Sequence, residues 1–191
     1  NKIEQTTSAN DRKDMKVIGN SLPRYNYNFG ISADWYGIDF SVLFQGIGKQ
    51  NWYPGAETSM FWGPYSRPYA SFIPSDFMSQ VWSEENTDAY FPRPRGYVAL
   101  GSNRELAVVN TKYLQNLAYC RLKNLSIGYT LPDKWLSKIG FEKIRVYFSG
   151  ENLLTFTKLH SDYIDPEQAS ASNSWKTSKS DANIYPWAKT Y

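Results

Sequence analysis

A regular alternation of apolar and polar residues limits the fold of this chain more than any other feature. From Tyr25 to Trp35, over 11 residues, odd positions are apolar or aromatic and even positions are polar or glycine. A period of two predicts a β-strand with one apolar and one polar face. The length is close to the roughly 9–11 residues of a tilted membrane-spanning strand. Aromatic residues stand at both ends of the apolar row, as they do in the two girdles of a membrane barrel.

The same pattern returns further along the chain. We expect strands at about 24–35, 38–48, 118–131 and 142–156, and the start of a last strand at 185–191. In the third strand, Arg121 and Lys123 share the parity of the apolar row, and we therefore expect them above a hydrocarbon band. Pro132 to Gly140 is typical of a short turn with one helical turn that Gly140 ends.

Two long stretches separate the strands and lack this periodicity. They span about 49–112 and 157–184, and within the first only Ser75–Glu84 has helical spacing. Connections of such length belong to functional loops when they occur in a compact structure. In a membrane barrel the long loops are extracellular and the short turns periplasmic. The connections between successive predicted strands are short, long, short and long. This order predicts that the first strand descends toward the periplasm.

Composition excludes several classes of function. The chain has one cysteine, Cys120, and one histidine, His160, which leaves no disulfide, no multi-cysteine zinc site and no cluster of catalytic or metal-ligating residues. A net charge of +3 without a Lys/Arg run does not predict nucleic-acid binding. We expect no catalytic residues, no metal and no cofactor. The mean hydropathy of −0.56 is compatible with barrel strands, whose alternation gives a weak hydropathy signal.

The predicted fold class is all-β, an antiparallel transmembrane β-barrel segment that is not a complete domain by itself. Four strands and part of a fifth cannot close into a cylinder, because the smallest membrane barrels need roughly 8 strands. An open sheet edge in lipid would leave backbone groups without hydrogen bonds, at several kcal/mol each. The N-terminal residues Asn1-Lys2-Ile3 show neither an initiator Met nor a signal peptide, so we expect the segment to continue into further barrel strands.

Several motifs, taken in order, resemble one family, the SusC/RagA-type TonB-dependent transporters of the outer membrane. The matching stretches are 14–25 (DMKVIGNSLPRY), 40–49 (FSVLFQGIGK), 119–132 (YCRLKNLSIGYTLP), 145–157 (RVYFSGENLLTFT), Asp165-Pro166-Glu167 and Tyr185-Pro186. The resemblance implies the last strands of a plugged barrel of roughly 22 strands. In that family the last strand runs several residues further than Tyr191, and the plug and the TonB-contacting segment lie upstream of the residues printed here.

The resemblance also implies function and partners. Such proteins are active importers of glycan or peptide oligomers in the outer membrane of Bacteroidota, and they are not enzymes. The implied partners are the remainder of the same barrel and its plug, a SusD-like surface lipoprotein, the TonB complex and membrane lipid. The implied localisation is integral to the outer membrane, with loops extracellular and turns periplasmic.

The alternation assigns residues to two faces. Five polar residues on one face could line a substrate path, contact the plug or only fill space by hydrogen bonds to one another. For these residues as a set, contact with the plug is favoured. This set is Asp34, Asp39, Gln45, Arg145 and Glu151. The residues predicted to face lipid are Phe29, Ile31, Phe40, Val42, Ile127, Val146 and Phe148.

Aromatic residues of the first long loop could stack on sugars, form a small core of the loop or contact the lipoprotein partner. For Trp82, beside Phe77, Met78 and Val81, packing is favoured. The candidate contact residues of this loop are Trp52, Tyr53, Trp62, Tyr65 and Arg67. Asp165 and Glu167 flank a proline in a predicted turn, where nothing places them about a scissile bond.

Two other functions remain open from the sequence. A passive or adhesive outer-membrane barrel would contain the same strands without a plug upstream. A soluble carbohydrate-binding β-sandwich would account for the aromatic residues and the alternation, but the aromatic girdles would have no explanation in it.

Overall fold

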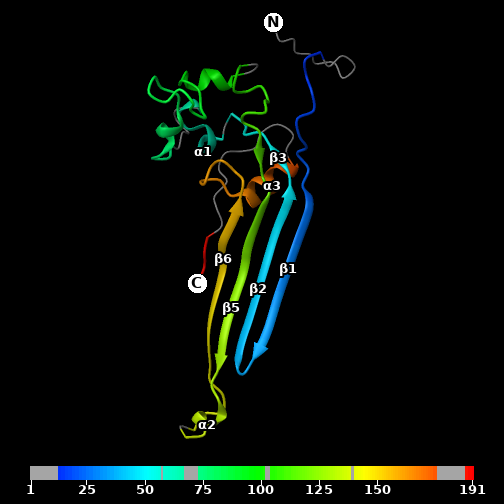
Figure 1. Cartoon of the computed structure of the whole chain (residues 1–191), viewed down its shortest axis with the longest axis vertical. Coiled ribbons are helices and arrows are strands. Elements are labelled where there is room, and N and C mark those ends of the chain that lie inside the picture. The colour runs from blue at the N-terminus through cyan, green and yellow to red at the C-terminus, as the bar shows by residue number, and fades with distance from the viewer. Residues whose placement is uncertain (1–12, 57, 67–72, 102–103, 139, 176–187) are drawn as a thin grey trace.

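One four-stranded antiparallel sheet forms the body of the computed structural model (Figure 1). The structure describes residues 13–56, 58–66, 73–101, 104–138, 140–175 and 188–191. The strands of the sheet are β1 (Arg24–Trp35), β2 (Ile38–Lys49), β5 (Tyr119–Thr130) and β6 (Arg145–Thr157), paired in the order β1-β2-β5-β6. The sheet is a single layer, and in the described part of the chain no second sheet covers its apolar face.

The short connection between β1 and β2 has the geometry of a tight hairpin. Tyr36 and Gly37 both have positive φ angles, 47° and 86°. Two consecutive residues of positive φ match the right-handed twist of the flanking strands, which is why such turns close hairpins. Trp35 lies directly opposite Ile38, and the pairing continues without a shift to Arg24 opposite Lys49.

The register places apolar residues of neighbouring strands side by side on one face. Ile31 pairs with Val42, which pairs with Leu125. One step along, Ala33, Phe40, Ile127 and Phe148 form a row across all four strands. Directly opposed residues of antiparallel strands point to the same side, so this face is continuous.

A β-bulge in β5 corrects the expected position of Arg121. Leu43 pairs with Asn124, but Phe44 pairs with Leu122, which leaves Lys123 as an extra residue. A single extra residue reverses the parity of everything beyond it. Arg121 therefore pairs with Gln45 on the polar face. The prediction that Arg121 shares the face of the apolar row was therefore wrong.

The residues between β2 and β5 fold into a compact unit at one end of the sheet (Figure 1). Its short elements are β3 (Asn51–Trp52), α1 (Ser59–Trp62), η1 (Gly63–Tyr65), η3 (Phe77–Gln80), η4 (Gly96–Leu100) and β4 (Gln115–Asn116). The helical pattern expected over Ser75–Glu84 corresponds only to η3, and Val81 already pairs with Phe91 in a β-bridge. No helix in the described part of the chain is long and apolar enough to cross a membrane.

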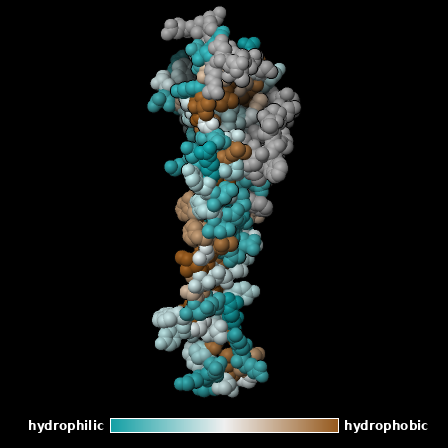
Figure 2. All heavy atoms as spheres, turned by 90° about the vertical axis from the view of Figure 1, so that its right-hand side faces the viewer, coloured by the Kyte–Doolittle hydropathy of each residue, from teal (hydrophilic) through white to brown (hydrophobic). Residues whose placement is uncertain are grey.

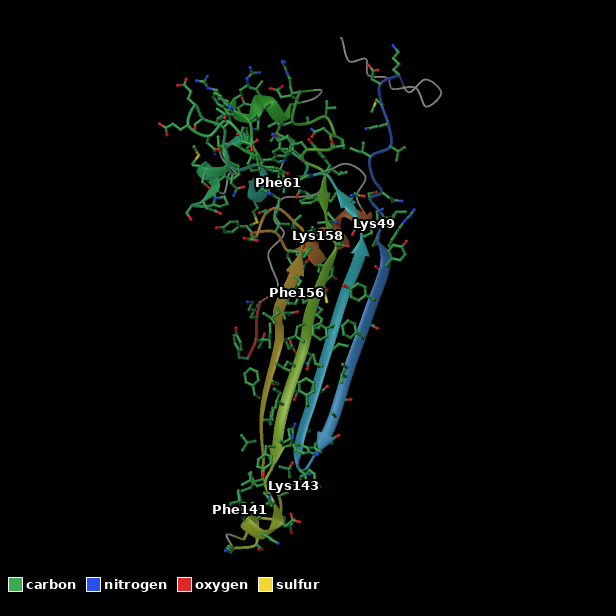
Figure 3. All side chains as sticks on the ribbon, in the orientation of Figure 1. Lys49, Phe61, Phe141, Lys143, Phe156 and Lys158 are labelled. Carbon is green, nitrogen blue, oxygen red and sulfur yellow. The ribbon has the colours of Figure 1, made fainter. Side chains whose placement is uncertain are left out.

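The opposite end of the sheet carries the connection between β5 and β6. It contains one helical turn, α2 (Asp133–Leu136), and Gly140 has a φ of 75°. Figure 3 labels Phe141 and Lys143 at this turn end, and Lys49 and Lys158 where β2 and β6 reach the loop end.

A longer helix, α3 (Pro166–Trp175), follows β6 within the stretch that was expected to be a polar loop. Of the last predicted strand, residues 185–187 lie outside the described residues. Thr190 forms an antiparallel bridge with Glu151 of β6, and both backbone hydrogen bonds of this bridge are present (2.9 and 3.2 Å). The described C-terminal residues thus begin to extend the sheet beyond β6.

Candidate functional site

The polar face of the sheet gathers the polar residues singled out in the sequence. Asp34 lies opposite Asp39 across β1 and β2, and Gln45, Arg145 and Glu151 share this face by their pairing with Arg121, Thr130 and Asn124. The five residues therefore lie on one side, but they do not form one cluster.

An ion pair crosses β5 near the turn end of the polar face. Arg145 of β6 donates to Asp39 of β2, with 2.8 Å between Nε and Oδ1. The guanidinium passes over Gly128, where a Cβ would collide with both partners. It also lies 4.9 Å from the centre of the Tyr147 ring. Only glycine at position 128 leaves room for this contact, which joins β6 to β2 across β5.

A second and more deeply buried cluster lies at the loop end of the same face. The side chain of Arg121 is 2% exposed. Its Nη1 donates to Glu167 (2.8 Å), its Nε donates to Thr155 (2.9 Å) and its Nη2 pairs with Asp165. Lys123, the bulge residue, also reaches Glu167 at 3.0 Å. The cluster fastens the segment after β6 onto the wall of the sheet.

Asp165 has a second role as the N-terminal cap of α3. Its Oδ1 accepts hydrogen bonds from the backbone N–H groups of Glu167 (2.9 Å) and Gln168 (3.2 Å). Pro166 follows at the first helical position, which suits proline because that N–H has no intrahelical partner. A capping residue followed by proline and then by an acidic residue is a sequence signal for the start of a helix. Neither this helix nor the pairing of the two acids with Arg121 was predicted from the sequence.

A groove separates α3 from the polar face of β1 and β2. Its volume is about 530 Å³. It is lined by Pro23, Asn26, Tyr27, Asn28, Gln45, Gly46, Ile47, Tyr119, Glu167 and Ser170. This volume lies within the range of small-ligand sites, roughly 300–1,000 Å³. Of its polar residues, the sequence singled out Gln45, as part of the polar set, and Glu167, in a predicted turn.

The aromatic residues of the first long loop form its core, which corrects the expectation that they contact a partner. Trp52 is 2% exposed, and Trp62 and Tyr65 are fully buried. Tyr53 packs against the same cluster and is half-buried, and Arg67 lies outside the described residues. Buried side chains cannot contact another protein, so Trp52, Trp62 and Tyr65 are packing residues.

This cluster, here called the loop body, includes residues from both long connections. Phe77 stacks on Phe91 with 4.8 Å between ring centres. Trp62 meets Tyr113 edge to face at 5.3 Å. The buried hydrophobic residues of the loop body are Trp52, Phe61, Trp62, Tyr65, Phe77, Val81, Phe91, Ala99, Leu100, Leu106, Tyr113, Leu117, Leu159, Ile164 and Ala169. The last three come after β6, so the two connections pack as one unit. Trp82 was expected to pack beside three neighbours in the first long loop. Of these four residues, Phe77 and Val81 are buried, Trp82 is half-buried and Met78 is exposed.

Two polar side chains of the loop body, those of Trp62 and Tyr53, find partners in its backbone. The Trp62 indole donates to the carbonyl of Pro54 (3.2 Å), and the Tyr53 hydroxyl donates to that of Leu106 (2.8 Å). Burial raises the pKa of Tyr53 and Tyr65, and it raises the pKa of Tyr113 to about 12. These hydroxyls stay protonated at neutral pH and act as neutral hydrogen-bond donors.

His160 joins the segment after β6 to the loop body. Its ring stacks on Tyr90 with 3.8 Å between centres, and its Nε2 is 2.7 Å from Oε1 of Gln80. Desolvation lowers the pKa of His160 below its ordinary value, while the nearby Asp162 carboxylate acts in the opposite sense. The neutral imidazole is therefore the form that this contact favours.

The apolar face carries all seven residues that were predicted to face lipid. Most are widely exposed, with Phe29 at 48%, Ile31 at 59% and Val146 at 64%. Val42, in contrast, is buried, at 8%. Figure 2 shows hydrophobic patches along the sheet and a further group at the loop end. An exposed apolar surface of this extent marks an interaction surface, with membrane or with protein.

The chain resembles proteins of known class over most of its length. No family model matches it. It is 34% identical over 156 residues to TonB-dependent receptor P3 of Formosa agariphila and 28% identical over 156 residues to TonB-dependent receptor P26 of the same bacterium. Each alignment covers 81% of this chain and 14% of the relative, so the chain spans about one seventh of their length.

Solved structures show the same fold. A structure of the RagAB peptide importer in the closed-closed state superposes with a TM-score of 0.57 and 23% identity, covering 97% of this chain and 18% of that one. The open-open state of the same importer gives a TM-score of 0.52, again with 23% identity, over 86% and 16% of the two chains.

Proposed function

Because the chain belongs to the TonB-dependent receptors, with the barrel fold of their SusC/RagA-type members, we propose that it forms wall strands and loops of an active outer-membrane importer. The observation that carries this proposal is the single-layer sheet with one continuous apolar face and one polar face. A sheet of this kind is stable when lipid covers the first face and a hydrated lumen meets the second. The unpaired edge of β1 would continue into further strands of the same barrel.

The two ends of the sheet have different roles in this proposal. The loop body and the segment after β6 lie outside the cell, and the turns at Tyr36-Gly37 and α2 lie in the periplasm. This direction follows from the rule that long barrel loops are extracellular. The residues Asp34, Asp39, Gln45, Arg145 and Glu151 then face the lumen, where the plug of the complete protein would contact them.

The loop body would meet a SusD-like lipoprotein through its surface and not through its buried aromatic residues. Tyr97 and Val98 of η4 are 56% and 53% exposed. Aromatic and aliphatic side chains of this kind are frequent in the centres of protein interfaces. Replacing both by Asp should reduce co-purification of the lipoprotein with the full-length barrel. The matched control is Phe141→Asp at the opposite end of the sheet, which should leave recovery unchanged, and equal recovery from both proteins would reject this contact.

The cargo proposed is an oligomer of glycan or peptide. The test is uptake by cells that carry the full-length importer. Uptake of a fluorescent oligomer should require TonB and the lipoprotein, and it should stop when the proton gradient that energises TonB is dissipated. Uptake that persists without TonB would support a passive pore instead and would overturn the proposal.

A further inference from the structure

We infer that Arg24 and Lys49, at the loop end of the polar face, bind a carboxylate or another oxyanion of the cargo. The two cations stand directly opposite each other on neighbouring strands. Neither makes an ion pair with an acidic residue in the described part of the chain. The inference rests on the proposed function, because it places cargo at the extracellular end of the lumen wall.

The register of the sheet brings the two cations together. Arg24 begins β1 and Lys49 ends β2, and the two residues are paired across the strands. Directly opposed residues of antiparallel strands point to the same side, with their Cβ atoms about 4.5–5.5 Å apart. Both side chains are exposed, and Figure 3 labels Lys49 at the loop end of β2. Like charges in such a pair destabilise a sheet, and an oxyanion bound to both would turn this repulsion into attraction.

The charges of β1 and β2 are separated along the strands. In each strand the basic residue stands at the loop end and the acidic residue, Asp34 or Asp39, stands near the turn end. The two charges are ten positions apart in each case, from 24 to 34 and from 39 to 49. Ten residues of strand span about 33 Å, well beyond the roughly 8 Å over which exposed charges act in physiological salt. The acidic residues of these strands therefore leave the positive charge at the loop end uncompensated.

The groove beside α3 continues from the cation pair. Pro23, next to Arg24, and Ile47, two residues before Lys49, belong to its lining. The acidic residue of the lining, Glu167, is already held by two cations of β5, at 2.8 Å and 3.0 Å. The groove therefore offers room for the rest of an anionic ligand, and its lining presents no unpaired carboxylate that would repel one.

The two side chains hold an oxyanion in different ways. The planar guanidinium of Arg24 can donate two parallel hydrogen bonds to one carboxylate. The ammonium of Lys49 is a compact charge on a flexible stem, and it adapts to the position of the anion. A neutral ligand lacks the charge that both groups would stabilise. The pair thus selects the charge of a ligand and not its backbone, so a sugar acid and an acidic peptide share the required chemistry.

Carbodiimide coupling in the full-length importer tests this site, because the reagent joins an amine to a carboxylate that is in contact with it. The probes are biotinylated hexagalacturonate and biotinylated hexaglutamate, and mass spectrometry of the digested protein locates the adducts. We expect adducts on Lys49 and none above background on Lys138, an exposed lysine at the opposite end of the sheet. Excess unlabelled acid should suppress the adduct, whereas its uncharged methyl ester should not. The probe that couples more readily identifies the source of the oxyanion.

Two variants show whether the cations act together and whether they serve the fold instead. Arg24→Gln should lower the yield of the Lys49 adduct about two- to fivefold, the range for one exposed ion pair. Arg24→Gln and Lys49→Gln should leave the thermal unfolding temperature in detergent unchanged or raise it, because each removes a repulsion between like charges.

Several results would overturn the inference. They are the absence of a Lys49 adduct with both probes, equal coupling at Lys138, suppression by the methyl ester, and coupling of Lys49 to a carboxylate of the importer itself. A clear loss of stability in the two variants would also overturn it, since another segment of the barrel would then be the partner of the cations. TonB-dependent uptake is measured separately, so import that persists without the adduct removes this site and leaves the proposed function intact.

Discussion

The guanidinium of Arg121 connects three parts of the chain that are far apart in sequence. It joins β5 to Thr155 of β6 and to Asp165 and Glu167 at the start of α3. A buried pair of this kind is costly to break, because the remaining charge stays buried without its counter-charge. The same carboxylate that pairs with Arg121 also caps the helix, so the loss of the pair also affects the helix end.

We predict that Arg121→Met loosens α3 strongly. Removing the guanidinium beside the buried Asp165 carboxylate should cost about 3–5 kcal/mol of local stability. Since 1.4 kcal/mol corresponds to a factor of ten, amide hydrogen exchange in residues 167–170 should accelerate at least about a hundredfold. The measurement uses the full-length protein in detergent. Adding Asp165→Asn should restore much of the protection, because it removes the charge and keeps the cap. A double variant as open as the single one would show that charge is not the cause.

Gly46 is the second residue whose identity the geometry requires. A Cβ at this position would collide with the carbonyl of Tyr119 and the ring of Tyr27. We predict that Gly46→Ala displaces Tyr27 and destabilises the barrel by about 1–3 kcal/mol, the usual effect of overpacking. Thermal unfolding in detergent measures this. Gly30→Ala on β1 is the control, because the atom nearest to a Cβ added there is 3.2 Å away. Equal losses of stability in both variants would contradict the specific role of Gly46.

At the scale of elements, the four strands were predictable and the bulge was not. The strands are 12 or 13 residues long, and the period of two in their sequences sets their position and faces. The bulge adds one residue, Lys123, whose side chain carries no turn signature. The only trace in the sequence is that Leu122 is apolar and Arg121 charged, the reverse of the parity from Leu125 onward. The cap signal at Asp165-Pro166 could have located α3, because it depends on local chemistry alone.

The two faces of β2 give a matched pair of variants. We predict that Val42→Arg destabilises the barrel in lipid vesicles by about 2–4 kcal/mol, the effect of a cation near the middle of the membrane. Ser41→Arg, one residue away on the polar face, should cost clearly less. Equilibrium urea unfolding of both full-length proteins measures the difference. Equal costs would mean that the apolar face does not meet lipid.

The contact of His160 with the loop body should depend on pH. Desolvation lowers the pKa of the folded-state imidazole below the ordinary value of 6.5. The stabilising effect is therefore complete above pH 6.5 and is lost as the pH falls through the lower, folded-state pKa. We predict that exchange protection of residues 158–163, corrected for the intrinsic effect of pH, falls between pH 7.5 and 5. His160→Phe keeps the ring on Tyr90 and should remove this pH dependence; a variant that retained it would implicate another group.

At the scale of the whole molecule, the sheet and the loop body are separate packing units joined at one end. The sequence indicated a small core in the long loop, but it could not assign Trp52 and Trp62 to that core or to its surface. An aromatic side chain suits both places, and only the three-dimensional closure of the loop decides. No local sequence pattern predicts that Leu159, Ile164 and Ala169 join this core, because they lie more than 40 positions after the rest of the cluster.

We predict that Trp62→Ala opens both connections at once. Truncation of a buried tryptophan should cost about 3–5 kcal/mol. Since Trp62 is fully buried in the shared cluster, exchange should accelerate together in residues 58–66 and 159–165, while the β1–β2 hairpin keeps its protection. Hydrogen exchange of the intact protein resolves the three regions. Acceleration confined to residues 58–66 would show that the connections pack independently.

The pairing order of the sheet also has a consequence for the time course of assembly. The β1–β2 hairpin closes through two residues and the β5–β6 pair through residues 131–144, whereas β2 can meet β5 only after residues 50–118 are brought together. The entropy lost in closing a loop grows with its length. We therefore expect two hairpins to form first and the β2–β5 seam to be slower. Arg121 lies in the β5–β6 hairpin, which forms early, and its partner Asp165 follows this hairpin in the chain. Folding of the loop body, in contrast, depends on the later pairing of β2 with β5. A nascent barrel would then hold α3 in place before the rest of its outer surface has folded.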